Sequence, residues 1–354
     1  MKRPALAMLA ALCAVAPPVW AQAQSGPQIY GTADLFLTRI APGERPVQTR
    51  ADSSALLASR VGIRGREDLG SGMAATYTLE AGLNGDDGAQ VDSNRLFNRQ
   101  AWVGLAGAWG EFRLGRQNTP QFLMNGRFDA FTSGTQASGW NNMTSAPPRA
   151  DAGIGWISPT WQGVRLQVLT GRGALGGAPV QPQVADRRHL QLAAEAERGA
   201  CFAGVNYQRT GSGAVPAIRR TFLGANCAVN GQWRLFLVAG REQSNVPGAL
   251  DVRVASLSAL YQPSAWDAWS FGWTQADDRL DGAGHGNAQQ QGLMYRRFVS
   301  KRTTLYATAS RLRQEDQRNG FTLGGAGVVS AAARPMSEPG GTIRAVQAGI
   351  LHNF

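Results

Sequence analysis

Arginines at alternate positions are the first residues of this chain whose spacing suggests chemistry. Within residues 56–66, apolar side chains occupy one face of an alternating segment, with the period of two that is expected of a β-strand. The opposite face carries Arg60, Arg64 and Arg66. Guanidinium groups in such a row form a fixed positive surface that attracts anions. The alternative is that each arginine is solvated or paired with a carboxylate such as Asp34, Asp68 or Glu80.

The sequence gives little evidence of a catalytic site. The three histidines stand apart from any grouping of an acid with a nucleophile; they are His189, His285 and His352. Neither a Gly-x-Ser-x-Gly elbow, nor a Cys-x-x-Cys pair, nor a phosphate-binding loop occurs. Asp86 and Asp87 could hold a surface cation, although adjacent loop aspartates are usually just solvated. We therefore expect no enzyme, no metal site and no cofactor.

The start of the chain is typical of an export signal. Residues 1–23 combine a basic beginning, an apolar run and small residues at the end, which is the pattern of a secretory signal peptide, cleaved after Ala21 or Ala23. A short membrane anchor is the alternative, but the run is too short to span comfortably and contains Pro17-Pro18. Residues 24–354 are expected to form a single exported domain, without the run of about 18 apolar residues that a transmembrane helix needs.

The remaining charge is positive and dispersed. The formal net charge of +11 falls by two, to +9, when Lys2 and Arg3 leave with the signal peptide. Nucleic acid is the usual partner of a basic chain. Here the arginines are scattered singly along strand-like stretches, and Lys301 is the only lysine left. We therefore expect no nucleic-acid partner but a wet, positive interior that attracts anions.

Two cysteines remain after the signal peptide. Cys201 and Cys227 flank a hairpin-like pair of segments whose loop is centred near Ala214. Both lie about equally far from the turn and should face each other across the pair. In an oxidising compartment this arrangement predicts a disulfide, with two free buried thiols as the alternative.

Alternating segments that end in turn signals recur along the whole mature chain. They are residues 28–38, 56–66, 74–84, 95–106, 111–117, 152–157, 164–171, 189–197, 201–209, 221–229, 233–240, 252–261, 266–274, 289–299, 303–312 and 343–354. About sixteen strands, an even number, suit a transmembrane antiparallel β-barrel of the outer-membrane type. A soluble Gly-rich sandwich would also alternate, but it needs an apolar core where these segments carry Arg, Gln, Thr and Glu.

The connections are asymmetric. Tight turns alternate with long polar loops, as expected when one end of a barrel faces the periplasm and the other the outside. Four tryptophans lie at or beside the tight turns, where a membrane interface would place them. They are Trp109, Trp161, Trp266 and Trp269.

One connection, residues 118–149, is far longer than ordinary strand connections. It is rich in aromatic residues, unlike a disordered linker, and Asp129 is its only carboxylate. The aromatic residues are Phe122, Phe128, Phe131 and Trp140. We expect this segment to fold back into the lumen of the barrel and to narrow it more by bulk than by charge.

Several motifs extend from the first predicted strand to the last. They are Ile29-Tyr-Gly-Thr-Ala-Asp34, Ser59-Arg-Val-Gly-Ile-Arg-Gly-Arg-Glu-Asp-Leu-Gly70, Arg95-Leu-Phe-Asn-Arg-Gln-Ala-Trp-Val-Gly-Leu105, Leu114-Gly-Arg-Gln117, Ser300-Lys-Arg-Thr-Thr-Leu-Tyr306 and Gly349-Ile-Leu-His-Asn-Phe354. In these motifs the chain resembles Gram-negative general porins, and more closely those of betaproteobacteria such as Burkholderia, Bordetella and Comamonas. The resemblance implies a homotrimer of sixteen-stranded barrels in the outer membrane, with the third extracellular loop folded into each pore.

The resemblance also implies a function and a set of site residues. It implies a water-filled channel for passive diffusion of small hydrophilic solutes, with a preference for anions. The arginine wall of the constriction maps onto Arg60, Arg99 and Arg149. Further candidates for the lumen are Arg64, Arg66 and Glu80, and Asp129 is the acid of the constriction loop. The alternation does not decide whether Arg99 points into the lumen, because an inward Arg99 would place the neighbouring Gln100 toward lipid.

Partners follow from the same resemblance. We expect small anionic solutes, outer-membrane lipid including lipopolysaccharide, and the barrel assembly machinery, which would read the C-terminal Phe354. Two alternatives remain open. One is a substrate-specific channel for a particular anion, and the other is a barrel enzyme or adhesin, against which the missing catalytic grouping argues.

Overall fold

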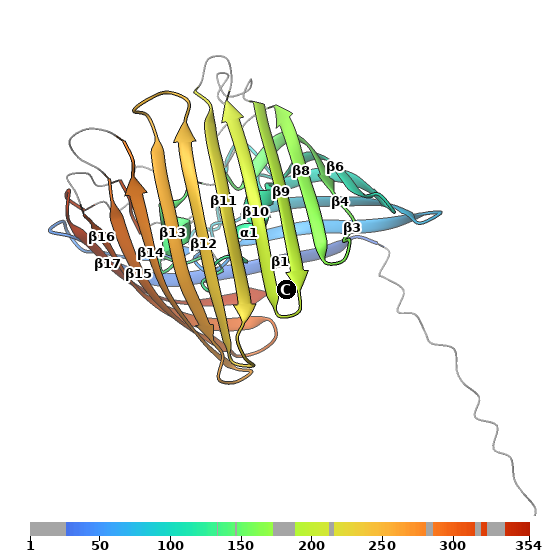
Figure 1. The fold of residues 1–354 in the computed structure, drawn as a ribbon. Coiled ribbons are helices and arrows are strands. Elements are labelled where there is room, and N and C mark those ends of the chain that lie inside the picture. Colours follow the sequence, from blue (N-terminus) through green and yellow to red (C-terminus); the bar gives the residue numbers. More distant parts are fainter. Residues whose placement is uncertain are drawn as a thin grey trace, which may run out of the picture.

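The strands of the protein form one closed antiparallel barrel. The computed structural model describes residues 26–132, 134–145, 147–172, 188–211, 216–280, 286–315, 320–323 and 337–354. The expected signal peptide, residues 1–23, lies outside the described residues. The last strand, β17 (Thr342–Asn353), pairs with the first, β1 (Gln28–Pro42), and closes the sheet (Figure 1). The predicted fold class, an antiparallel β-barrel, is confirmed.

The strands between β1 and β17 follow one another around the barrel in chain order. They are β2 (Gln48–Ser53), β3 (Arg60–Gly70), β4 (Met73–Gly82), β5 (Gln100–Gly107), β6 (Gly110–Asn118), β7 (Arg149–Ile157), β8 (Val164–Arg172), β9 (Arg188–Arg198), β10 (Cys201–Gly211), β11 (Ile218–Ala228), β12 (Trp233–Ser244), β13 (Asp251–Tyr261), β14 (Asp267–Asp278), β15 (Ala288–Phe298) and β16 (Thr303–Gln314). Within the described ranges, β2 and β3 share one position, because both pair with the same edge of β1, β2 opposite residues 35–40 and β3 opposite residues 28–32. The barrel therefore has sixteen strand positions, as predicted.

Burial along the strands is inverted relative to a soluble protein. On β12 and β13, Leu237 and Leu257 point outward and are 58% and 55% exposed. On β10, Asn206 and Gln208 point inward and are fully buried. An apolar outer face suits lipid, and a polar inner face suits water. Trp161 and Trp266, beside the tight turns, are exposed on the outside as an interfacial girdle requires.

Two predicted strands begin later than expected. Residues 56–59 leave the sheet before Arg60, because the buried carboxylate of Asp34 accepts a hydrogen bond of 2.7 Å from the Leu57 amide. Residues 95–99 likewise precede β5 as turns and bends rather than strand. The alternation of side chains therefore does not extend across the boundary between Arg99 and Gln100.

The 118–149 connection contains two short helices, which the sequence analysis did not predict. They are α1 (Pro120–Asn125) and α2 (Gly139–Met143). The side chains of Thr119 and Ser138 cap them by accepting hydrogen bonds from backbone amides. Thr119 followed by Pro120 is a start signal that could have been recognised. In the part of the chain that the structure describes, no helix is long and apolar enough to cross a membrane.

Candidate functional site

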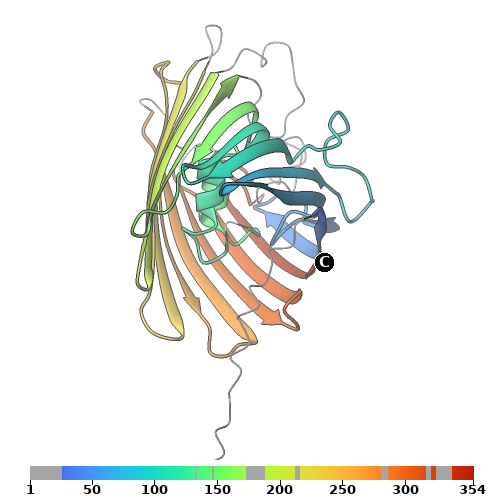
Figure 2. The same cartoon turned by 90° about the vertical axis from the view of Figure 1, so that its right-hand side faces the viewer.

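The 118–149 connection packs against strands distant from its own ends. It joins β6 to β7, yet α1 contacts β9 and β10, and α2 contacts β13, β14 and β15. Figure 2 shows the teal helical turns of this connection among the strands. Glycines on the strands make room: a Cβ at Gly224 would overlap the ring of Phe128, and a Cβ at Gly272 would overlap Phe131. The connection is therefore fitted to the inward side of β11 and β14.

Asp129 holds the connection to this wall. Its side chain is buried, with 2% exposure, and its Oδ2 accepts a hydrogen bond of 2.6 Å from the Ser138 hydroxyl. Its Oδ1 accepts a longer one, 3.4 Å, from Ser258 on β13, whose hydroxyl also accepts from the Ala130 amide at 3.0 Å. The single acid of the connection thus serves as an anchor.

Two further anchors fix the connection at other strands. The Gln136 amide donates to the Gln347 side chain on β17 at 2.9 Å. The Ser145 amide donates to Glu242 on β12 at 2.7 Å, and Arg220 on β11 donates to the Ser145 hydroxyl at 3.0 Å. The connection is tied to the barrel wall at three places, which opposes its displacement as a unit.

Glu80, on β4, is the centre of a group of charged side chains on the barrel wall. The Arg99 Nε donates to Glu80 Oε1 at 2.6 Å, and the Arg60 Nε lies 3.4 Å from Oε2. The Tyr30 hydroxyl donates to the same Oε2 at 2.8 Å. One carboxylate is shared by two guanidinium groups, so both arginines are paired and the group keeps a positive charge.

A cavity of about 500 Å³ separates this group from the 118–149 connection. Arg60, Arg64 and Arg99 line it on the side of the wall, and Glu80 is the only carboxylate among its lining residues. Phe122, Leu123 and Asn125 are among the residues that line it on the side of the connection. Three arginines against one glutamate leave the lining with a formal charge of +2, and Asp129 does not contribute to it.

The other predicted site residues lie outside this lining. Arg149 opens β7 and is buried, with its guanidinium 5.4 Å from the centre of the Phe122 ring. Among the described residues, its Nε has no hydrogen-bond partner. Arg66 is exposed on β3. The structure thus brings Arg60, Arg64, Arg99 and Glu80 together and places Arg149 behind Phe122.

Three features of this region were not predicted from the sequence: Tyr30, the inward position of Gln100 and the ion pairs of Asp151. Tyr30 was not predicted, although it shares its face of β1 with Asp34 and the alternation could have indicated it. Gln100, which the alternation placed toward lipid, lines the cavity together with Arg99. Asp151 also pairs with Arg116, and with Arg95 at 3.1 Å. That cluster depends on the bends before β5, which no periodic pattern reveals.

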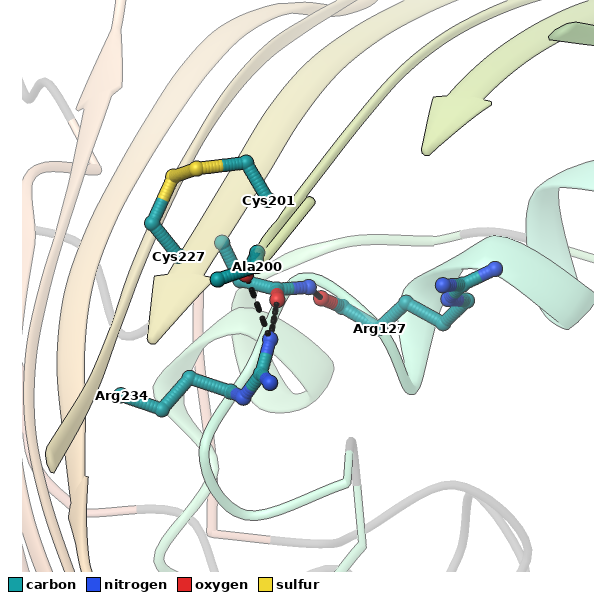
Figure 3. The surroundings of a disulfide bond; sticks show 6 residues. Arg127, Ala200, Cys201, Cys227 and Arg234 are labelled. Atoms are coloured by element: carbon teal, nitrogen blue, oxygen red, sulfur yellow. Dashed lines mark hydrogen bonds between the residues drawn. A yellow bond between two sulfur atoms is a disulfide. The ribbon is translucent and has the colours of Figure 1, made fainter. Parts of the chain in front are cut away.

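The two cysteines lie directly opposite each other on β10 and β11, and their sulfurs are joined (Figure 3). Cys201 is exposed on the outer face next to the tight turn. Arg234 on β12 donates to the Ala200 carbonyl at 3.4 Å (Figure 3) and also to the Asn226 side chain. The disulfide therefore braces the turn end of the barrel and lies away from the cavity.

Other reactive side chains form no recognisable site. Within the described ranges, no three His, Cys, Asp or Glu side chains are close enough together to hold a metal ion. A ring nitrogen of His189 lies 3.4 Å from the Asp151 carbonyl oxygen, and one of His352 lies 2.9 Å from the Thr303 hydroxyl. His285 lies outside the described residues.

Sequence comparisons give one family match and several partial relatives. A model of the family described as Gram-negative porin matches residues 5–317. An outer membrane porin protein of Bordetella pertussis is 35% identical over 113 residues, which are 31% of this chain and 29% of that protein. Outer membrane porin protein 32 of Delftia acidovorans is 35% identical over 128 residues, 35% of each chain. The match thus spans about a third of the length of these relatives.

Solved structures share the fold of the whole barrel. The anion-selective porin from Comamonas acidovorans superposes with a TM-score of 0.76 at 22% identity, covering 94% of this chain and all of that one. The trimer form of OmpT, an outer membrane protein of Vibrio cholerae, gives a TM-score of 0.69 at 13% identity, covering 93% and 99%. At these identities the similarity establishes the architecture alone.

Proposed function

The chain belongs to the Gram-negative porin family, and from this premise we propose that it forms a water-filled channel through the outer membrane for passive diffusion of small hydrophilic solutes. The observation that carries the proposal is the inverted barrel, with apolar side chains outside and polar side chains inside. Such a wall isolates a polar lumen from lipid. Family and fold point to a channel rather than an enzyme.

The channel is expected to favour anions. Support comes from the cavity between Glu80 and the 118–149 connection, whose lining carries a formal charge of +2. A positive neck lowers the electrostatic barrier for anions and raises it for cations. The structurally similar Comamonas protein is described as anion-selective, and we extend that property to this chain on the basis of its own arginines. Arg60, Arg64 and Arg99 are assigned to the selective neck, with Arg149 supporting it through Phe122.

The 118–149 connection is assigned the role of narrowing the pore. Its contacts with β9, β10 and β13–β15 support this role, because these strands are distant from the paired strands β6 and β7 that it joins. Since Asp129 is turned into the wall, the connection restricts the pore by the volume of its side chains. Size exclusion and the electrostatic field of the arginines would then act at the same depth in the pore.

The oligomeric state and the partners of the barrel are also part of the proposal. A structurally similar outer membrane protein of Vibrio cholerae has a trimer form, and we propose a homotrimer here. Lipopolysaccharide would surround the barrel on its loop side. The C-terminal Phe354 exchanges two backbone hydrogen bonds of 3.1 Å with Gly31, and its exposed ring is available to the barrel assembly machinery.

Single-channel recording in a planar bilayer tests the proposal. We expect stepwise conductance, and a reversal potential under a KCl gradient that indicates anion preference. Absence of conductance would reject the channel, and cation preference would reject the selective neck. A conductance that saturates with one organic anion would favour the alternative, a substrate-specific channel.

A further inference from the structure

Arginines also form an ordered pattern on the outer face of the barrel. In the described part of the chain, four outward-facing pairs lie directly opposite each other across neighbouring strands. Three are Arg172 with Arg188, Arg209 with Arg219, and Arg241 with Arg253. The fourth is Arg311 on β16 with Arg344 on β17. All four pairs lie at the strand ends away from the tight turns, so they define one rim of the outer face.

The rim lies at one edge of the band of exposed apolar side chains on the outer face of the barrel. On β12 the exposed Trp233 marks the turn end and Arg241 lies eight residues further along, with Leu235 and Leu237 exposed between them. Eight residues span about 26 Å along a strand, or about 20 Å along the membrane normal at a tilt of about 40°. This is close to the thickness of the apolar band of such barrels, about 25 Å. The arginine rim therefore lies at the depth of lipid headgroups.

The pair Arg311 and Arg344 lacks compensating charge. Arg39 on β1 and Arg313 on β16 are exposed on the same face, close to Arg344 in the register. Among the described residues, none of these four makes an ion pair, and neither does Glu315, which follows β16. By contrast, Arg241 pairs with Asp251 at 2.6 Å, and Arg253 lies opposite Asp277.

Like charges opposite each other across strands are destabilising. An anion between Arg311 and Arg344 would remove this repulsion. Guanidinium groups bind phosphate through two parallel hydrogen bonds, so two neighbouring arginines form a receptor for a phosphate group.

A hollow of about 450 Å³ adjoins the pair. Arg39, Arg311 and Arg344 line it, together with apolar side chains such as Leu293 and Val346. Its lining includes small residues, among them Gly292 and Ala309. A hollow with cations on one side and apolar groups on the other suits a molecule that carries both a phosphate and hydrocarbon.

We propose that this hollow, between β15, β16, β17 and β1, binds a phosphate group of lipopolysaccharide in the leaflet on the loop side. The inference deepens the proposed function and depends on its placement of the barrel in the outer membrane. Arg311 and Arg344 hold the phosphate, Arg39 adds a third positive charge, and the apolar lining contacts the acyl chains. Coulomb attraction is strong at this depth, because headgroups exclude part of the screening water.

Binding of lipid A to the purified mature protein tests the site. The test variant is Arg311→Gln with Arg344→Gln, and the matched control is Arg241→Gln with Arg253→Gln, which removes an equal charge from a compensated pair on the same rim. Native mass spectrometry in detergent would titrate bisphosphorylated lipid A, dephosphorylated lipid A and inorganic phosphate. We expect the test variant to bind bisphosphorylated lipid A about tenfold more weakly or worse, and the control to remain near the wild type.

Several results would overturn the site. They are equal loss in both variants, no loss in the test variant, equal binding of dephosphorylated lipid A, and binding of inorganic phosphate as tight as that of lipid A. If the test variant kept lipid A but lost its oligomeric state, the surface would be an interface between copies instead. Both variants should keep wild-type conductance, which shows that they fold. Conductance without lipid A binding rejects only this inference, and binding without conductance rejects only the channel.

Discussion

The Arg99 Nε lies 2.6 Å from Glu80 Oε1, and this ion pair determines the charge of the cavity that faces the 118–149 connection. Arg60 approaches the other oxygen of the same carboxylate at 3.4 Å. Glu80 therefore holds both guanidinium groups in place while neutralising only one of them. In the proposed neck, selectivity and local order would therefore both depend on the Glu80 side chain.

Glu80→Gln should increase anion preference. Removing the only carboxylate of the lining raises its formal charge from +2 to +3, and the reversal potential should move further toward that of the anion. Because Arg60 and Arg99 lose their shared partner, the open-channel current should also become noisier. Glu315→Gln, at the exposed end of β16, is the control and should change neither quantity. An unchanged reversal potential in Glu80→Gln would place this group off the permeation path.

Arg60→Glu should move the reversal potential toward cations. The matched control is Arg66→Glu on the same strand, because Arg66 is exposed and does not line the cavity. Both variants change the net charge equally, so a local field predicts a clearly larger shift for Arg60. Equal shifts would mean that selectivity comes from the total charge of the lumen and not from the neck.

Phe128→Ala should loosen the 118–149 connection. The Phe128 ring is 1% exposed and lies 5.9 Å from the ring of Phe202. Truncating a buried phenylalanine to alanine costs about 3 kcal/mol or more. We expect the variant protein to have a lower melting temperature and a larger, less stable conductance than the wild type. Phe112→Ala is the control, because Phe112 is 49% exposed on the outer face of β6 and does not line the cavity. A folded Phe128→Ala barrel with wild-type conductance would contradict the proposed narrowing.

The double variant Cys201→Ser/Cys227→Ser should reduce stability without altering conduction. The disulfide closes a loop with a sequence separation of 26, for which loop-closure entropy predicts a loss of about 3.5 kcal/mol in the free energy of unfolding. Since Cys201 faces outward beside a turn, conductance and reversal potential should stay unchanged. Guanidinium unfolding with and without reductant measures the loss. A count of two free thiols in the denatured, unreduced wild type would refute the disulfide.

Local patterns were sufficient to predict the barrel. Alternation with a period of two is a property of neighbouring residues, so it located the strands and placed Arg60 and Arg64 on the inward face. Inverted burial, with leucine outside and glutamine inside, follows from the same pattern once lipid is the outer solvent. The equal distances of Cys201 and Cys227 from their turn likewise predicted that they face each other, as they do across β10 and β11.

Only the tertiary structure decided which charges meet. Asp129 is bonded to Ser258, a residue 129 positions later, and lies outside the lining that Arg60 and Arg99 share. Glu80 accepts a hydrogen bond from Tyr30, which lies 50 positions earlier on another strand. The bends before β5 bring Arg99 and Gln100 to the same cavity, against the alternation. These contacts depend on side-chain hydrogen bonds between segments that only barrel closure brings together. Periodicity therefore determined the wall of this protein, and long-range packing of the 118–149 connection determined the charge and size of the space inside it.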